Sequence, residues 1–503
     1  MSTVKRVVKN TGFLYAKMAI TVFISLYTTR LVLAALGSED FGVFNLVGGI
    51  IAMLGFFNAS MASATQRFMS YAEGEGDKEK QKKVFNVSFV LHFIIALLLG
   101  FILWIVGYFL FDGVLNIDVD KVFAAKVIFF SLILSTMFTV MTVPYDAVLN
   151  ANENMLYYSI VGIVESILKL IVAIVIFYML GDKLIWYGVL MAIVPIVIML
   201  IMRVYCHRKY AECVLAPREY MDKRLMREMS GFAGWGLLTS ATTMITMQGA
   251  AIVLNVFFGV LANAAHSIAN QIGGQIMVFS NNMLKALNPN IVKSAGAKDT
   301  AGMIRMTTTG SKFSFMLLAV LAVPVCLEMP YFLKIWLKDV PEYAILFCRL
   351  VIIRLVITQF HVPLSSAILA GGRVKIHSLL ISFIALLTLP FTIGLYHLEF
   401  PIYTIYIVFI GMTLLYLVVN LFFIKKRYQL NIMHFLRHIV FRGTLCAFFS
   451  FLGGVLIIEF MPSTFYRFLV VTIICMIIFL ALFYFLVLEN SEKNIIRKLI
   501  SKR

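Results

Sequence analysis

The chain has 503 residues, of which 61% are hydrophobic and only 14% are charged, and its formal net charge is +18. A soluble domain is about half apolar and about a quarter charged, so this composition excludes a globular soluble enzyme, a disordered chain and a secreted disulfide-linked scaffold. The six cysteines lack metal-ligand spacing and lie mostly in apolar segments, which indicates small packing residues. We therefore expect a polytopic membrane protein.

A membrane-spanning helix needs about 20 apolar residues, and this length divides the chain into predicted helices. In chain order, the fourteen predicted helices are 11–36, 41–68, 84–111, 122–148, 158–180, 185–206, 231–258, 262–291, 313–337, 343–369, 377–398, 402–424, 442–460 and 467–489. The first apolar stretch is long enough to span and lacks the small-residue cleavage site of a signal peptide, so we expect it to be retained. The predicted fold class is an all-α membrane protein.

The basic residues fix the predicted orientation. Connectors on the N-terminal side of the membrane hold 29 Lys and Arg, whereas connectors on the other side hold 3. The positive-inside rule then predicts that both termini are cytoplasmic, which explains the basic excess without nucleic acid as a partner. No predicted connector exceeds about 24 residues and no Walker A motif occurs, which leaves no place for a soluble catalytic domain or an ATP-driven motor. We expect a channel, a secondary transporter or a scaffold, not an enzyme, with no cofactor.

An internal repeat divides the predicted helices. At an offset of 222 residues, Gly37 matches Gly259 and Asp77 matches Asp299, and both glycines end the first helix of a half. The segment that begins at Pro144 matches the one that begins at Pro363, with one inserted residue. Parallel repeats are typical of several transporter folds. We predict two six-helix lobes, 1–206 and 231–424, joined by a cytoplasmic linker, 207–230, and enclosing a central cavity, while 425–503 holds a linker, helices 13 and 14 and a cytoplasmic tail.

The first hairpin resembles that of the oligosaccharide flippases in the multidrug/oligosaccharidyl-lipid/polysaccharide (MOP) exporter superfamily, in Arg30, Leu33, Leu36, Gly37, Phe41, Gly42 and Leu46. The likeness covers essentially the whole chain. It implies a MATE-like, Wzx-type flippase that moves undecaprenyl-pyrophosphate-linked oligosaccharides for O-antigen, capsule or exopolysaccharide from the cytoplasmic to the periplasmic leaflet by alternating access. The same resemblance implies a bacterial inner-membrane location and, as further partners, a polysaccharide polymerase and assembly proteins.

Three alternatives to this function stay open. A lipid II flippase shares the fourteen helices, but helix 1 lacks the Arg-Asp pair associated with that branch. A cation-coupled multidrug antiporter typically stops at twelve helices. A non-transporting membrane scaffold for polysaccharide assembly is the third alternative, and it would tolerate neutralisation of the intramembrane charges.

Charges inside the predicted helices are the best guide to a site. Each costs about 2.5–3.5 kcal/mol to insert at mid-membrane, and such residues usually face a polar interior. Lys169 and Arg354 lie near the middle of their helices. Glu165 precedes Lys169 by four residues, which predicts an ion pair on one helix face, either structural or part of a cavity wall. Arg354 is the predicted phosphate contact because its planar fork suits phosphate oxygens. Glu328 is the predicted partner of Arg354 or Arg349.

The remaining predicted site residues are less central. Lys17 lies within snorkelling reach of the membrane surface, so it is either an anchor or a pocket residue. The polar run on helices 7 and 8 is suited to sugars or to helix–helix hydrogen bonds. The predicted binding set therefore also includes Arg30, Lys17, Lys285, Arg349, Gln248, Asn255, Asn270 and Gln271. A coupling ion, H⁺ or Na⁺, would use the carboxylates of Asp146, Glu165 and Glu328. His266 and His361 are predicted to be satisfied hydrogen-bonding residues.

Overall fold

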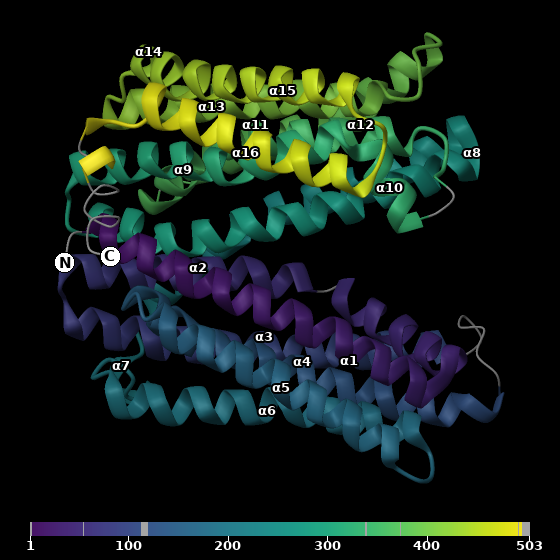
Figure 1. Ribbon diagram of the computed structural model, residues 1–503. Helices are drawn as coiled ribbons and strands as arrows, with labels where there is room; N and C mark the ends of the chain where they lie inside the picture. The colour runs from purple at the N-terminus through teal and green to yellow at the C-terminus, as the bar shows by residue number, and fades with distance from the viewer. Residues whose placement is uncertain are drawn as a thin grey trace. The chain divides into compact units, whose positions relative to one another are not determined.

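The computed structural model describes residues 3–53, 55–111, 119–337, 340–372, 374–490 and 492–494, and within them it contains helices and no strand. The helices are α1 (Thr3–Met53), α2 (Gly55–Glu75), α3 (Lys78–Phe109), the short η2 (Val119–Lys121), α4 (Val122–Ala151), α5 (Met155–Tyr178), α6 (Lys183–Lys209), α7 (Pro217–Tyr220), α8 (Lys223–Gly296), α9 (Thr300–Leu327), α10 (Met329–Leu337), α11 (Ala344–Ala370), α12 (Lys375–His397), α13 (Thr404–Tyr428), α14 (Ile432–Phe435), the π-helical η3 (Leu436–Phe441), α15 (Arg442–Phe460) and α16 (Phe465–Leu486) (Figure 1). The predicted tail beyond residue 494 lies outside the described residues.

Long apolar helices confirm the predicted class, because a helix satisfies its own backbone hydrogen bonds in lipid. Among the described residues, 12 helical segments are long and apolar enough to span a membrane, or up to 13 if the bent pair Glu39–Ile51 and Gly55–Glu75 is one span. This criterion therefore identifies 12 or 13 of the fourteen predicted spans within the described part of the chain. The predicted helix 262–291 does form as part of α8, but its amides, histidine and lysine make it too polar to count.

The described residues cluster into two compact units. The N-terminal unit is Arg6–Leu237 with Gly296–Lys298, and the C-terminal unit includes Leu238–Ala295 and Asp299–Arg503. Within the N-terminal unit, α4 is central and packs against α2, α3, α5 and α6. Its repeat counterpart α11 packs in the C-terminal unit against α9, α10 and α13. The lobe boundaries predicted at 206, 231 and 424 stay predictions.

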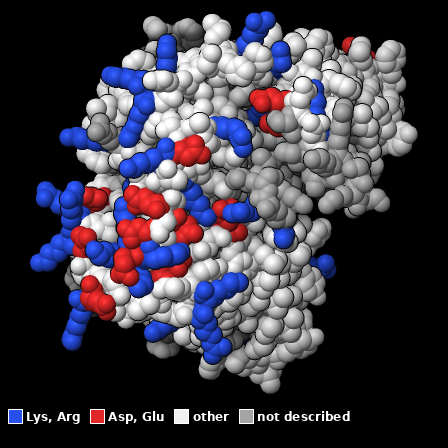
Figure 2. Space-filling view, turned by 90° about the vertical axis from the view of Figure 1, so that its left-hand side faces the viewer, with Lys and Arg blue, Asp and Glu red and all other residues white. Residues whose placement is uncertain are grey.

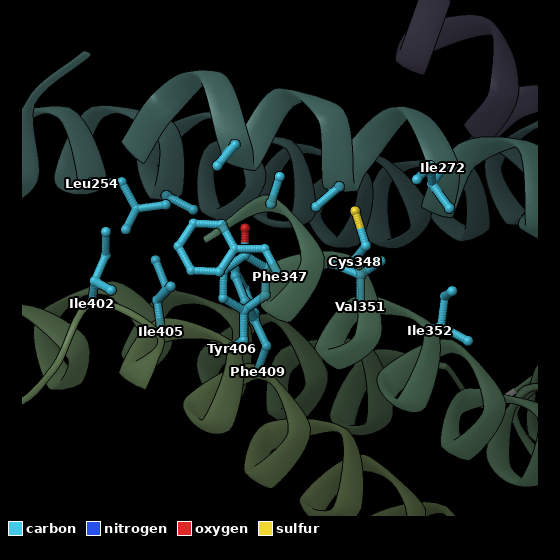
Figure 3. Packing of buried hydrophobic residues seen from close by; sticks show 14 of the residues in the cluster. Leu254, Ile272, Phe347, Cys348, Val351, Ile352, Ile402, Ile405, Tyr406 and Phe409 are labelled. Atoms are coloured by element: carbon cyan, nitrogen blue, oxygen red, sulfur yellow. The ribbon is translucent and has the colours of Figure 1, made fainter. Parts of the chain in front are cut away.

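The apolar core of the C-terminal unit lies where α8, α11 and α13 meet (Figure 3). Leu254 of α8 lies near Phe347 of α11 and Tyr406 of α13 in this cluster, and the three side chains are almost fully buried. The rings of Phe347 and Tyr406 have centroids 4.5 Å apart. Phe409, one turn after Tyr406 on α13, belongs to the same cluster. This packing fixes the position of α11 relative to α13.

Two glycines break their helices in the same way. Gly37 has φ 78° and ψ 174°, and Gly259 has φ 78° and ψ −170°. Only glycine adopts this backbone region at low cost. The predicted equivalence of the two helix ends is therefore confirmed. The aspartates at the same offset also match, because Asp77 accepts from the Lys80 N–H at 2.9 Å and Asp299 accepts from the Gly302 N–H at 2.8 Å, each at the start of a helix.

The last two long helices, α15 and α16, pack against each other and against α9 (Figure 1). One ion pair lies at the end of α9 and another near its middle. Glu328, directly after α9, binds Arg467 of α16 at 2.8 Å, and Lys312 on α9 binds Glu492 after α16 at 2.8 Å. The side chains of Glu328 and Lys312 are only 1% and 5% exposed. These pairs attach the two ends of α16 to α9.

Charged side chains gather at the helix ends. Figure 2 shows basic and acidic side chains mixed on the face formed by the ends at the left of Figure 1. In the turn between α2 and α3, Lys78 pairs with Glu73 at 3.2 Å and Lys80 pairs with Glu75 at 2.6 Å. Exposed pairs of this kind contribute little to stability, about 0–1 kcal/mol each. Their presence indicates a hydrated connector.

Candidate functional site: a charged pocket in each unit

The N-terminal unit contains a pocket of about 130 Å³ that we call the lysine pocket. It lies among α1, α4, α5 and α6, and its lining residues are Lys17, Thr139, Thr142, Asp146, Tyr158, Val161, Gly162, Glu165, Pro195, Ile198 and Met202. Three of them, Lys17, Asp146 and Glu165, are predicted site residues. The structure therefore brings one ammonium and two carboxyl groups from three helices to the wall of one small cavity.

The end of the Lys17 side chain fits between the Tyr158 ring and Gly162 in this pocket. Its Nζ lies 4.4 Å from the centroid of the Tyr158 ring, a distance at which a cation is attracted to the ring face. The end of the side chain also lies directly against Gly162, where a Cβ atom would overlap it. Of the two predicted roles of Lys17, surface anchor and pocket residue, the geometry supports the pocket.

Glu165 connects the lysine pocket to the predicted ion pair. Its Oε1 lies 2.6 Å from the Lys169 Nζ, one helical turn along α5, so this predicted pair is confirmed. Both side chains are about two-fifths exposed, at 41% for Lys169 and 39% for Glu165. Lys17 and Lys169 balance Asp146 and Glu165 in formal charge.

The C-terminal unit contains a larger pocket, of about 330 Å³, that we call the arginine pocket. It lies among α8, α11, α12 and α13, and its lining residues are Thr243, Thr246, Met247, Met277, Arg354, Leu355, Thr358, His361, Val362, Ser365, Ile381, Ala385, Thr388, Phe409, Met412, Thr413, Tyr416 and Asn420. These lining residues include a guanidinium, an imidazole and several hydroxyl groups, but no Asp or Glu. The pocket therefore has a fixed positive charge without a carboxylate to balance it.

Arg354 supplies that charge. The carbon of its guanidinium lies 5.0 Å from the centroid of the Phe409 ring, and its Nε has no hydrogen-bond partner among the described residues. The Nδ1 of His361, two turns along α11, likewise has no hydrogen-bond partner in the described part of the chain. His266 is a satisfied hydrogen-bonding residue, as predicted, because it bonds the Tyr406 hydroxyl at 2.7 Å and the Asn270 side chain at 2.9 Å.

The two pockets lie at equivalent places in the internal repeat. Helices α4 and α11 correspond at an offset of 219 residues, which matches Pro144 with Pro363. At this offset, three residues of α4 that line the lysine pocket match three residues of α11 that line the arginine pocket: Thr139 matches Thr358, Thr142 matches His361, and Asp146 matches Ser365. Sequence reasoning missed most of these positions, although the repeat that it identified contains them. It also missed Tyr158 and Gly162, which look like ordinary residues of an apolar helix.

Glu328 and Arg349 have other partners than predicted. Glu328 bonds the Arg467 guanidinium, so the expectation that it pairs with Arg354 or Arg349 is wrong. Local sequence gives no sign of the pairing with Arg467, because the two residues are 139 positions apart. Arg349 donates to the Cys326 and Leu327 carbonyl oxygens at 2.8 and 3.3 Å, where it caps the end of α9. Both residues lie outside the two pockets.

The other predicted binding residues also lie outside both pockets. Lys285 is half-buried on α8, and the remaining ones are exposed on α1 and α8, namely Arg30, Gln248, Asn255, Asn270 and Gln271. Their exposure is compatible with contacts to a substrate, and their binding roles stay predictions.

Comparison with known proteins agrees with this architecture. Residues 15–175 match the family model MatE. A relative described as "Uncharacterized membrane protein EpsK", from Bacillus subtilis (strain 168), is 22% identical over 321 residues, and the match spans 63% of this chain and 63% of the relative. The chain thus matches a little under two thirds of that relative's length.

Solved structures share the fold. One described as "Outward-facing conformation of a multidrug resistance MATE family transporter of the MOP superfamily" aligns with a TM-score of 0.74 at 15% identity, over 85% of this chain and 96% of that one. Another, described as "Reverse polarity of binding pocket suggests different function of a MOP superfamily transporter from Pyrococcus furiosus Vc1 (DSM3638)", aligns with a TM-score of 0.71 at 16% identity, over 85% and 96%. Residues 15–175 are thus similar to the MatE family, and the chain shares the all-helical membrane fold of these solved structures.

Proposed function

We propose that this protein is a flippase that moves undecaprenyl-pyrophosphate-linked oligosaccharide repeat units from the cytoplasmic to the periplasmic leaflet by alternating access. The observation that carries the proposal is Arg354, a fixed cation in a pocket whose lining contains no carboxylate. An organic cation would be repelled there, whereas an anionic headgroup would be attracted. Pyrophosphate is such a headgroup, and it must lose water to cross the membrane.

The chemistry of arginine suits this headgroup. The guanidinium stays charged at physiological pH and presents a planar fork that binds two phosphate oxygens at once. Charge-assisted hydrogen bonds of this kind replace part of the hydration that the phosphate loses. Thr358, His361 and Tyr416 add further hydrogen-bonding groups to the same pocket wall. The site is therefore suited to an anion that carries several acceptor oxygens.

The glycan would use a different surface. The exposed amides of Gln248, Asn255, Asn270 and Gln271 on α8 can both donate and accept hydrogen bonds, as sugar hydroxyls require. Arg30 and Lys285 would add positive charge along the path of the headgroup. The excess of Lys and Arg on one side of the predicted spans supports cytoplasmic termini, and the proposed location is the bacterial inner membrane.

The test is mass spectrometry of polyprenyl-linked intermediates in cells depleted of this protein. A complete undecaprenyl-pyrophosphate oligosaccharide should accumulate on depletion. Wild-type protein should clear it, Arg354→Gln should not, and Arg305→Gln should, because Arg305 is exposed on α9 outside both pockets. The variants are compared at equal abundance in the membrane.

Other results of this experiment would redirect the assignment. Accumulation of lipid II would identify a lipid II flippase. The absence of any accumulating lipid would refute both flippase functions. Restoration of the surface glycan in depleted cells by both Arg354→Gln and Lys169→Gln would favour a scaffold.

A cation-coupled multidrug antiporter is the second candidate function. The observation that favours it is the presence of two carboxyl side chains, those of Asp146 and Glu165, in the lysine pocket. Carboxylates of this kind are suited to carrying H⁺ or Na⁺ against a drug. Drug sensitivity on deletion, with unaltered surface glycan, would establish this function instead.

A further inference from the structure

The lysine pocket has the ligand chemistry of a site for a monovalent metal cation. Asp146 on α4 and Glu165 on α5 bring carboxylate oxygens to it, and Thr139, Thr142 and Tyr158 bring hydroxyl oxygens. Hard cations prefer such oxygen ligands. A cavity of about 130 Å³ also has room for an ion and its remaining waters, since one water takes about 30 Å³ in the liquid.

One positive charge already belongs to this pocket. The ammonium of Lys17 reaches it from α1 and lies 4.4 Å from the centroid of the Tyr158 ring. The missing side chain at Gly162 leaves the space that the end of Lys17 occupies, because a Cβ there would overlap both Cε and Nζ. A lysine that merely reached for the membrane surface would need neither the ring nor this space on α5.

The charged side chains at the pocket already balance one another, so a further cation would be electrostatically unfavourable. Asp146 and Glu165 supply two negative charges, while Lys17 supplies one positive charge and Lys169, at 2.6 Å from Glu165, supplies the second. A metal cation would make the group net positive in a partly buried position, where an unbalanced charge is costly. α6 adds only Pro195, Ile198 and Met202 to the lining, so it offers no further negative charge.

We infer that Lys17 is the resident cation of the N-terminal unit, that its ammonium keeps Na⁺ out of the lysine pocket, and that removal of this side chain converts the pocket into a sodium site. The N-terminal unit of the wild-type protein is then not a device for sodium coupling. This inference concerns only the N-terminal unit and does not depend on the identity of the substrate.

The experiment measures thermal unfolding of the purified full-length protein in detergent, with Na⁺ replaced by choline at constant ionic strength and no substrate present. Wild type should show the same Tm in both salts. Lys17→Ala should show a Tm that rises with Na⁺ concentration, because a ligand that binds only the folded state multiplies the ratio of folded to unfolded protein, by about 100-fold at 100 times Kd. Lys126→Ala, an exposed lysine of the same unit outside the pocket, should behave like wild type.

Two further variants make the result specific. Asp146→Asn in the Lys17→Ala background should abolish the response to Na⁺. Gly162→Ala retains Lys17 but displaces its end, so it should gain a weaker response, and it decides the matter if Lys17→Ala fails to fold. A Na⁺-dependent Tm in wild type that Asp146→Asn abolishes, or no response in a folded Lys17→Ala, would overturn the inference. So would a response in Lys17→Ala that survives Asp146→Asn.

Discussion

Glu328 at the end of α9 accepts two hydrogen bonds from the Arg467 guanidinium on α16, at 2.8 and 2.9 Å from Nε and Nη2. This bidentate geometry is the strongest form of a carboxylate–arginine contact. With the side chain of Glu328 1% exposed and that of Arg467 13% exposed, the pair is shielded from water. It assigns Glu328 a role in holding α16 against α9, while the predicted role of Glu328 in ion coupling stays a prediction.

Glu328→Gln should destabilise the protein strongly. Breaking a buried pair leaves an uncompensated charge and costs about 3–5 kcal/mol. The matched control is Glu228→Gln, which removes the partner of Arg224 from a pair whose side chains are 52% and 89% exposed and should cost less than about 1 kcal/mol. Unfolding monitored by intrinsic fluorescence in a denaturant series would show the difference. Equal losses of unfolding free energy in the two variants would contradict a stabilising role for the buried pair of Glu328 and Arg467.

Near the middle of α9, loss of Lys312 should destabilise the protein far more than loss of Glu489, one of its two acidic neighbours. Its Nζ lies 2.8 Å from Glu492, whose side chain is 11% exposed, and 3.6 Å from Glu489, whose side chain is 67% exposed. Lys312→Met should therefore destabilise the protein by several times the effect of Glu489→Gln, which we expect below about 1 kcal/mol. Limited proteolysis of the segment after α16 would report the same ranking. A larger effect from Glu489→Gln would refute it.

Substitution of the two helix-breaking glycines should have similar effects. Gly37→Ala and Gly259→Ala each place a side chain at φ 78°, at a cost of about 1–3 kcal/mol, although neither Cβ would meet another atom within 4 Å. Gly234→Ala is the control, because its Cβ would also meet nothing, while its helical backbone favours alanine by about 0.5–1 kcal/mol. Tm should fall for the first two variants and rise for the third. A fall for all three would show that crowding, not backbone geometry, governs these sites.

The start of α8 should depend on pH through Asp222. The Leu225 and Arg224 N–H groups donate to its carboxylate and hold the pKa of Asp222 below its usual value. A lowered folded-state pKa means that the stabilisation is present above the unfolded-state pKa, about 3.9, and is lost as the pH falls through the folded-state value. Asp222→Ala should cost about 1 kcal/mol near pH 7. Hydrogen exchange in the first turn of α8 should show a difference between the proteins that shrinks below about pH 4.

Features that depend on neighbouring residues or on the internal repeat were predictable from the sequence. The pair Glu165 and Lys169 is separated by one helical turn, so its contact follows from helix geometry. Gly37 and Gly259 were identifiable because the repeat places both at the end of a helix. The all-α membrane class follows from apolar runs of sufficient length. The predicted helix 262–291 also forms, but it is too polar to be identified as a span by length and composition.

Contacts between distant helices were not predictable. Glu328 and Arg467 are separated by 139 residues, and no helix periodicity relates them. Likewise, Gly162 matters because the end of the Lys17 side chain, from a residue 145 positions earlier on α1, occupies the space that a Cβ at Gly162 would fill. One chain without aligned relatives carries no signal for such pairings. The pockets themselves were only partly predictable from the sequence, because the repeat indicates equivalent positions but not which of them border a cavity.

The correspondence between Asp146 and Ser365 has a consequence for the history of the chain. If the two halves descend from one duplicated ancestor, the same position of α4 and α11 has retained an acid in one copy and a neutral hydroxyl in the other. The pocket of the first half therefore holds charges of both signs, whereas the pocket of the second half holds only positive charge. A chain assembled from two copies of the first half would keep the scaffold but lose the basic pocket, and in this sense the halves are no longer interchangeable.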